Sequence, residues 1–124
     1  MEFVSTNNAP SAIGPYSQAI IHAGLVYTSG QIALTPKGEM TENEITKQTH
    51  QVLQNLSAVL KEANSSLEKV IKTTIFLANM DDFATVNTIY AEYFSNHKPA
   101  RSTVAVKTLP KNALIEIDCV AATK

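Results

Sequence analysis

The strongest constraint on the fold is a segment with helical periodicity between residues 45 and 63. Threonine and apolar side chains recur there in steps of three and four residues, the spacing of one helix face: Ile45, Thr49, Val52, Leu53, Leu56, Val59, Leu60 and Ala63. Thr41 and Glu44 match a capping box, in which each side chain binds a free amide at the helix start, so we expect the helix to begin there. A helix with one apolar stripe needs a surface to cover.

The chain on either side of this helix has the composition of β-strands. Residues 17–32 indicate two strands around Ala23-Gly24, a hairpin turn with glycine at positive φ. Alternating β-branched residues predict a strand over residues 70–78. Two more strands are expected near residues 101–108 and 114–122.

The order of these elements predicts the fold class. A second helix is expected to begin at Asp81 or Asp82 and to carry its apolar stripe as far as Phe94. Residues 4–10 begin as one further short strand. The chain therefore reads as a single α+β domain over residues 1–124, with two helices packed on one face of a mixed β-sheet.

The second face of that sheet is expected to need a partner. Alternate residues of a strand point to opposite faces of the sheet. In the strand expected over residues 70–78, one face would carry Ile71, Ile75 and Leu77, and the other would carry Phe76 and Ala78. Two amphipathic helices cover one face only, so apolar side chains on the other face predict contact with another subunit.

The composition excludes several classes of function. The net charge of the 124 residues is −1 and no basic block occurs, so there is no electrostatic footprint for nucleic acid or an anionic membrane. The single cysteine, Cys119, cannot form an intrachain disulfide, which fits a reducing compartment. No apolar run reaches membrane-spanning length, and the first residues lack the features of a signal or transit peptide. We expect a soluble cytoplasmic protein.

No resident metal or cofactor is expected either. His22, His50 and His97 do not have the spacing of metal ligands and have no companion cysteines. No glycine-rich phosphate loop occurs.

Two charged residues in β-like surroundings are the candidates for chemistry. Arg101 begins one expected strand, and Glu116 lies between two isoleucines in the next. An unpaired buried ion costs roughly several kcal/mol, so each charge needs a reason to be there. The two could form a structural ion pair or point to solvent. Alternatively, the guanidinium could grip a substrate carboxylate with two parallel hydrogen bonds while the glutamate handles a water.

The motifs around these residues occur in the order found in one known family. The chain resembles the RidA/YjgF family, the reactive intermediate deaminases, in four stretches that span nearly its whole length: Ile13-Gly14-Pro15-Tyr16-Ser17-Gln18-Ala19; Val26-Tyr27-Thr28-Ser29-Gly30-Gln31-Ile32; Asn87 with Tyr90, Tyr93 and Phe94; and Pro99-Ala100-Arg101-Ser102 followed by Leu109-Pro110-Lys111 and Ile115-Glu116-Ile117.

The resemblance implies an assembly and an activity. Members of the family are homotrimers of the chorismate-mutase-like type, with ligand sites in clefts between subunits. The implied activity is cofactor-free hydrolysis of reactive 2-enamine and 2-imine acids, such as 2-aminoacrylate and 2-aminocrotonate, to 2-oxo acids and ammonia. Two alternatives stay open: an endoribonuclease or translation inhibitor, and a non-catalytic regulatory protein that binds 2-oxo acids.

The resemblance also implies roles for individual residues. Arg101 would hold the substrate carboxylate, Glu116 would hold and polarise the attacking water, and Tyr16 would orient the imine. Pocket contacts would come from Ser29, from Asn87, and from the backbone at Gly30 and Thr103. A glycine inside a strand often marks a bulge or a close backbone approach to a ligand, and Gly30 interrupts the strand expected over residues 26–32. Tyr16 could instead be a packing residue and Asn87 a helix-surface amide.

Thr103 departs from the family pattern, because many members carry cysteine there. Any thiol chemistry proposed for relatives therefore does not transfer to this chain. Cys119 does not replace that cysteine, because a buried strand cysteine is usually an inert small hydrophobe.

Overall fold

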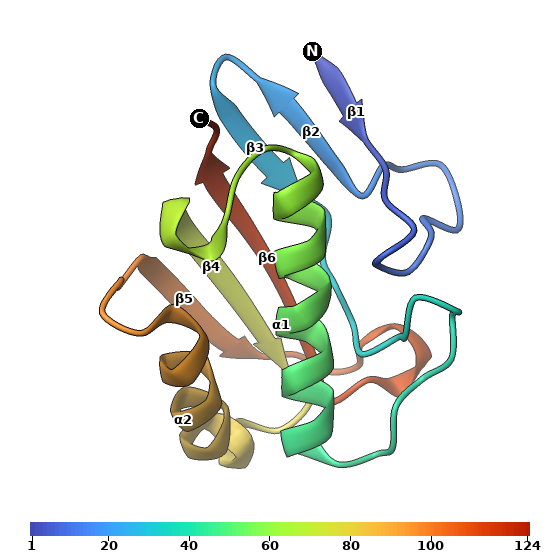
Figure 1. The fold of residues 1–124 in the computed structure, drawn as a ribbon. Coiled ribbons are helices and arrows are strands. Elements are labelled where there is room, and N and C mark those ends of the chain that lie inside the picture. Colours follow the sequence, from blue (N-terminus) through green and yellow to red (C-terminus); the bar gives the residue numbers. More distant parts are fainter.

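The computed structural model describes residues 1–124 as one six-stranded sheet with two α-helices on one of its faces (Figure 1). The elements in chain order are β1 (Glu2–Val4), β2 (Ala19–His22), β3 (Leu25–Thr28), α1 (Ile45–Glu62), β4 (Val70–Leu77), α2 (Phe83–Phe94), β5 (Ala100–Ala105) and β6 (Ile115–Ala122). Short 3₁₀ turns cover Leu67–Lys69, Met80–Asp82 and Pro110–Asn112. The spatial order is β1-β2-β3-β6-β4-β5, with only β4 and β5 parallel. The predicted α+β class with a mixed sheet is confirmed.

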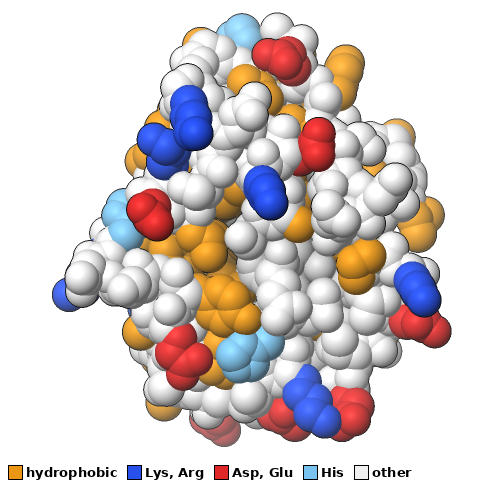
Figure 2. Space-filling model, viewed as in Figure 1, with side chains coloured by type: hydrophobic (Ala, Val, Ile, Leu, Met, Phe, Trp, Pro, Cys, Tyr) orange, Lys and Arg blue, Asp and Glu red, His pale blue; other side chains and the backbone are white.

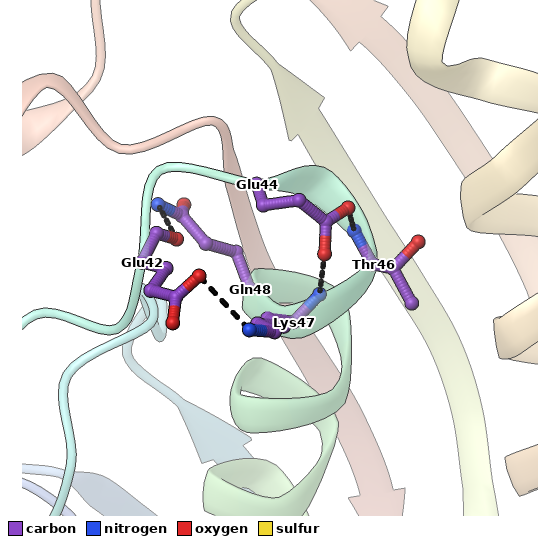
Figure 3. A network of polar contacts seen from close by, with 5 residues as sticks. All are labelled: Glu42, Glu44, Thr46, Lys47 and Gln48. Atoms are coloured by element: carbon purple, nitrogen blue, oxygen red, sulfur yellow. Dashed lines mark hydrogen bonds and ion pairs between the residues drawn. The ribbon is translucent and has the colours of Figure 1, made fainter.

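The first helix begins later than the capping box indicated. Glu44 itself is the N-cap residue, and its carboxylate accepts from the amides of Thr46 at 2.6 Å and Lys47 at 3.1 Å (Figure 3). These bonds, that to Thr46 first, hold the pKa of Glu44 below its usual value. The hydroxyl of Thr41 has no partner, so the predicted start at Thr41 is wrong. A glutamate at the N-cap satisfies the same free amides from one side chain.

The start of α2 is only partly as expected. Asp82 is the N-cap residue, but its side chain makes no capping bond. The side chain of Asn79 instead caps the preceding 3₁₀ turn by accepting from the amide of Asp81 at 2.9 Å.

A β-bulge in the strand β4 turns one residue to the face of the sheet opposite to the expected one. The pairing with β6 shifts between Val70 and Lys72, which leaves Ile71 without a partner and 48% exposed. Beyond the bulge, Ile75 and Leu77 are fully buried beneath the helices. The prediction that Ile71 shares a face with Ile75 is therefore wrong, because one inserted residue moves side chains to the opposite face.

The core lies between the sheet and the two helices. Its largest fully buried side chains are Leu53, Leu56, Leu60, Ile75, Leu77, Ile115 and Ile117. Figure 2 shows the helix-covered side, where acidic and basic side chains are interspersed and hydrophobic atoms are visible between the helices. Neither helix is long and apolar enough to cross a membrane.

The opposite face of the sheet has no helix over it. The register places Phe3, Ile20, Tyr27 and Val120 in one row across four neighbouring strands. Phe3 is 77% exposed and Tyr27 is 45% exposed. An apolar row of this kind on an open sheet face fits the expectation that another subunit covers it.

Candidate active site

Four of the seven predicted site residues gather around one pocket of about 490 Å³. Tyr16 reaches it from the loop before β2, Ser29 and Gly30 from the loop after β3, and Glu116 from β6. The hydroxyl of Ser29 donates to the carbonyl of Ser17 at 2.5 Å, which ties the two loops together. We call this group the Glu116 half-site.

The backbone of Gly30 lies directly against the side chain of Glu116. A Cβ on Gly30 would lie 2.5 Å from Oε2 of Glu116 and 2.8 Å from Cδ. The approach is fixed by paired bonds between Gln31 and Ile117, N–H to carbonyl at 2.9 Å and 3.1 Å. The group that approaches Gly30 in this chain is the Glu116 side chain, so the predicted approach to a ligand stays a prediction; β3 ends at Thr28 instead of continuing to Ile32.

Glu116 is a half-buried carboxylate without a hydrogen-bond or ion-pair partner in the chain. It pairs with Phe76 of β4 and therefore points away from the helices. Burial, and then the nearby charge of Asp118, raises the pKa of Glu116 above its ordinary value. A carboxyl group in this state exchanges protons more readily near neutral pH than an exposed one.

Tyr16 is placed at the mouth of this pocket and is 52% exposed. Its hydroxyl accepts from the amide of Ile13 at 3.4 Å, and its ring lies near Gly14, whose φ is +124°. The phenol therefore belongs to a loop instead of a strand and has no place in the core.

Arg101 lies in a different place, on the edge strand β5. It pairs with Thr73, a fully buried residue under the helices, so its side chain points to the helix-covered face. The guanidinium carbon lies 5.0 Å from the ring centroid of Tyr90 and 5.5 Å from that of Phe83. These aromatic faces hold the cation by cation–π attraction and leave its N–H groups free for an anion.

Asn87 and Thr103 accompany Arg101. Asn87 and Arg101 line a second pocket of about 450 Å³, and Thr103 follows two residues along the same strand on the same face. The side-chain oxygens of Asn87 and Thr103 are buried without a hydrogen-bond partner. Burial without a hydrogen-bond partner costs about 1–3 kcal/mol for each such oxygen, so both are free to accept a hydrogen bond from water or another group. We call this group the Arg101 half-site.

The two half-sites lie on opposite faces of the sheet. The alternative of an ion pair between Arg101 and Glu116 within the chain is therefore wrong, and the one ion pair present joins Lys47 to Glu42 (Figure 3). One chain holds a carboxylate and a guanidinium that are both uncommitted but cannot meet on the same ligand.

Two further residues that line the pocket of the Glu116 half-site were not predicted as site residues. Gln18 is buried, accepts from the amide of Thr6 at 2.7 Å and donates to the carbonyl of Pro10 at 2.7 Å, which fixes the loop beside the pocket. Lys111 lines the pocket from the turn before β6. Both stand inside the quoted motifs, but nothing in their spacing distinguishes them from surface polar residues.

Cys119 lies on the helix-covered side of β6. Burial raises the pKa of its thiol to about 12, which fits the prediction of an inert residue. No group of three or more His, Cys, Asp or Glu side chains is placed to hold a metal ion.

Comparisons with known proteins connect this geometry to a family. The family model described as Endoribonuclease L-PSP matches residues 6–123. AldR of Lactococcus lactis, whose name describes a regulator, is 52% identical over 125 residues, which cover 100% of this chain and 99% of that protein. Reactive Intermediate Deaminase A of Arabidopsis thaliana is 50% identical over 121 residues, covering 97% of this chain and 65% of the plant protein.

The fold agrees with the sequence match. The YjgF gene product of E. coli superposes with a TM-score of 0.94 at 40% identity, covering 100% of both chains. Since the family model covers nearly the whole chain and these relatives match it throughout, the chain belongs to the RidA/YjgF family.

Proposed function

We propose that this protein is a cofactor-independent deaminase that hydrolyses reactive 2-imino acids and their enamine tautomers to 2-oxo acids and ammonia. The observation that carries the proposal is the pair of uncommitted charges, Arg101 on an aromatic support and Glu116 in a pocket. A relative that is 50% identical bears the name Reactive Intermediate Deaminase A.

The proposed chemistry uses one cation and one carboxylate. Arg101 holds the substrate carboxylate through two parallel hydrogen bonds. Glu116 accepts a proton as water adds to the C=N carbon, and that proton then passes to the nitrogen. The hydroxyl proton of the resulting carbinolamine then moves to the nitrogen as the C–N bond breaks, so that ammonia leaves and the C=O bond of the 2-oxo acid forms. Tyr16 and the backbone at Gly30 orient the imine, which lowers the entropic part of the barrier.

We expect the substitution Arg101→Lys to remove most of this activity although the charge is kept. An ammonium is a point charge and cannot reproduce the planar fork of a guanidinium. The assay couples a threonine dehydratase, which releases 2-iminobutanoate, to this protein and follows the loss of the imine. Near-normal turnover in the variant would exclude the carboxylate-binding role of Arg101.

The proposed site needs two subunits, because a single chain places its halves on opposite faces of the sheet. Family resemblance favours a homotrimer, so light scattering should return three subunits. Co-refolding equal amounts of Arg101→Lys and Glu116→Gln should restore about a quarter of the sites by random assembly of closed rings. A stable monomer, or a mixture as inactive as its components, would contradict the intersubunit site.

One alternative retains specific support. The same two half-sites could bind a 2-oxo acid without turnover and report it to a partner, and AldR is described as a regulator. The coupled assay separates the two functions, because a sensor binds pyruvate and leaves the imine untouched. The endoribonuclease function is supported by names alone, those of the family model and of two solved relatives, and the net charge of −1 argues against it.

A further inference from the structure

The Glu116 half-site contains a cation that the proposed chemistry does not use. Lys111 and Glu116 are the only charged residues that line this pocket. Lys111 forms no ion pair, since the one ion pair in the structure lies at the start of α1. Its ammonium is therefore free to bind an anion inside or above the pocket.

The backbone that carries Lys111 is held in a strained conformation. Lys111 has φ 56° and ψ 25°, and Asn112, which follows it, also has φ 56°. Two consecutive non-glycine residues in the left-handed region are unfavourable, and such strain persists where the surroundings fix it.

Buried anchors on both sides fix this turn. Leu109 and Ala113 are 5% and 1% exposed, and the amide of Asn112 donates to the carbonyl of Leu109 at 3.0 Å. The amide of Leu114 donates to the side chain of Gln48 in α1 at 2.9 Å. The position of Lys111 relative to Glu116, five residues further on in β6, is therefore set by the fold.

We propose that Lys111 binds a second anionic group at the side-chain end of the substrate, so that the site prefers dicarboxylic 2-imino and 2-oxo acids. This inference rests on the proposed function, in which Arg101 takes the carboxylate that all 2-imino acids share. The pocket of about 490 Å³ leaves room beyond a three-carbon acid. Its remaining lining is apolar at Ile13, Ile32 and Leu34 and polar but uncharged at Ser11, Gln18, Ser29 and Gln31, so Lys111 is the only cation available to an anion there.

The test compares two ligands of equal shape by calorimetry. 2-Oxopentanedioate carries a terminal carboxylate, and 2-oxo-5-methylhexanoate carries an isopropyl group in its place. We expect the dicarboxylate to bind about tenfold more tightly, the ratio that one charge-assisted hydrogen bond gives. The substitution Lys111→Gln should equalise the two affinities, and Lys111→Arg should keep most of the difference.

Two further variants separate charge from backbone effects. Lys107→Gln removes an exposed lysine that lines none of the described pockets, and it should leave the ratio unchanged. Lys111→Gly should abolish the ratio without lowering the melting temperature, because glycine tolerates positive φ. A ratio near one in the parent protein, or equal weakening of both ligands by Lys111→Gln, would overturn the inference; equal weakening would assign Lys111 to the shared carboxylate.

Binding and turnover distinguish this inference from the proposed function. If the parent protein binds the dicarboxylate preferentially but does not consume 2-iminobutanoate, the deaminase proposal fails and the role of Lys111 stands. If it consumes the imine but shows no preference between the two ligands, the deaminase proposal stands and the role of Lys111 is wrong.

Discussion

Glu116→Gln should slow deamination by roughly 10²-fold or more while pyruvate still binds, because the change removes the proton acceptor and leaves Arg101 untouched. The amide keeps the size and hydrogen-bonding capacity of the carboxyl group, so the oligomeric state should not change. Single-turnover measurement of imine loss, with pyruvate affinity measured in parallel, tests both parts. Unchanged turnover combined with failed assembly would make Glu116 a structural residue.

Asp118→Asn is the matched control for this substitution. Asp118 lies two residues further along β6 on the same face, but it does not line the pocket. It contributes to the raised pKa of Glu116, second after burial. The control should therefore keep most of the turnover and move the acidic limb of the pH profile to lower pH.

The pH dependence of stability has a defined sign at Glu116. Its pKa is higher in the folded protein than its ordinary 4.5, so the folded state favours the protonated form. That contribution is fully present below the unfolded pKa and is lost as the pH rises through the folded pKa. The amide in Glu116→Gln does not ionise, so the variant does not lose stability as the pH rises. At neutral pH it should be more stable than the parent protein, although it is less active.

The local elements of the fold could be predicted from the sequence because their causes are local. The hairpin turn at Ala23-Gly24 has φ of 52° and 80° at its two residues, as expected for a two-residue turn. The apolar stripe of α1 is buried as its spacing predicts. The predicted start of α1 was wrong because Thr41 has the preferred N-cap chemistry, whereas in the structure the carboxylate of Glu44 takes that role. Only tertiary placement decides between them.

The arrangement of the site could not be predicted from spacing. Arg101 and Glu116 face opposite sides of the sheet because Arg101 pairs with Thr73 and Glu116 pairs with Phe76, which point to opposite faces of β4. Strand order and register depend on contacts between distant segments, as the unpredicted bulge at Ile71 illustrates. The glycine at position 30 predicted a bulge or an approach to a ligand, whereas the group beside it in the structure is Glu116, which lies far away in the sequence.

That close approach gives the second large prediction. Gly30→Ala should reduce deamination by about 10²-fold, because a misplacement of about 1 Å at a catalytic group can cost that much. The added Cβ would lie 2.5 Å from Oε2 and 3.0 Å from Cγ of Glu116, so the carboxylate has to move away. The fold should survive, since the displaced atoms belong to a flexible side chain at the edge of a pocket.

Gly24→Ala is a control that should change stability and leave activity intact, the opposite of the result expected for Gly30→Ala. A Cβ at Gly24 meets nothing within 4 Å, but the residue has φ +80°, which costs an alanine about 1–2 kcal/mol. Gly24→Ala should therefore lower the melting temperature and keep the turnover of each folded molecule, whereas Gly30→Ala should keep most of the stability and lose the turnover. If Gly30→Ala instead loses stability and retains activity per folded molecule, the glycine serves the fold, and the placement of Glu116 does not depend on it.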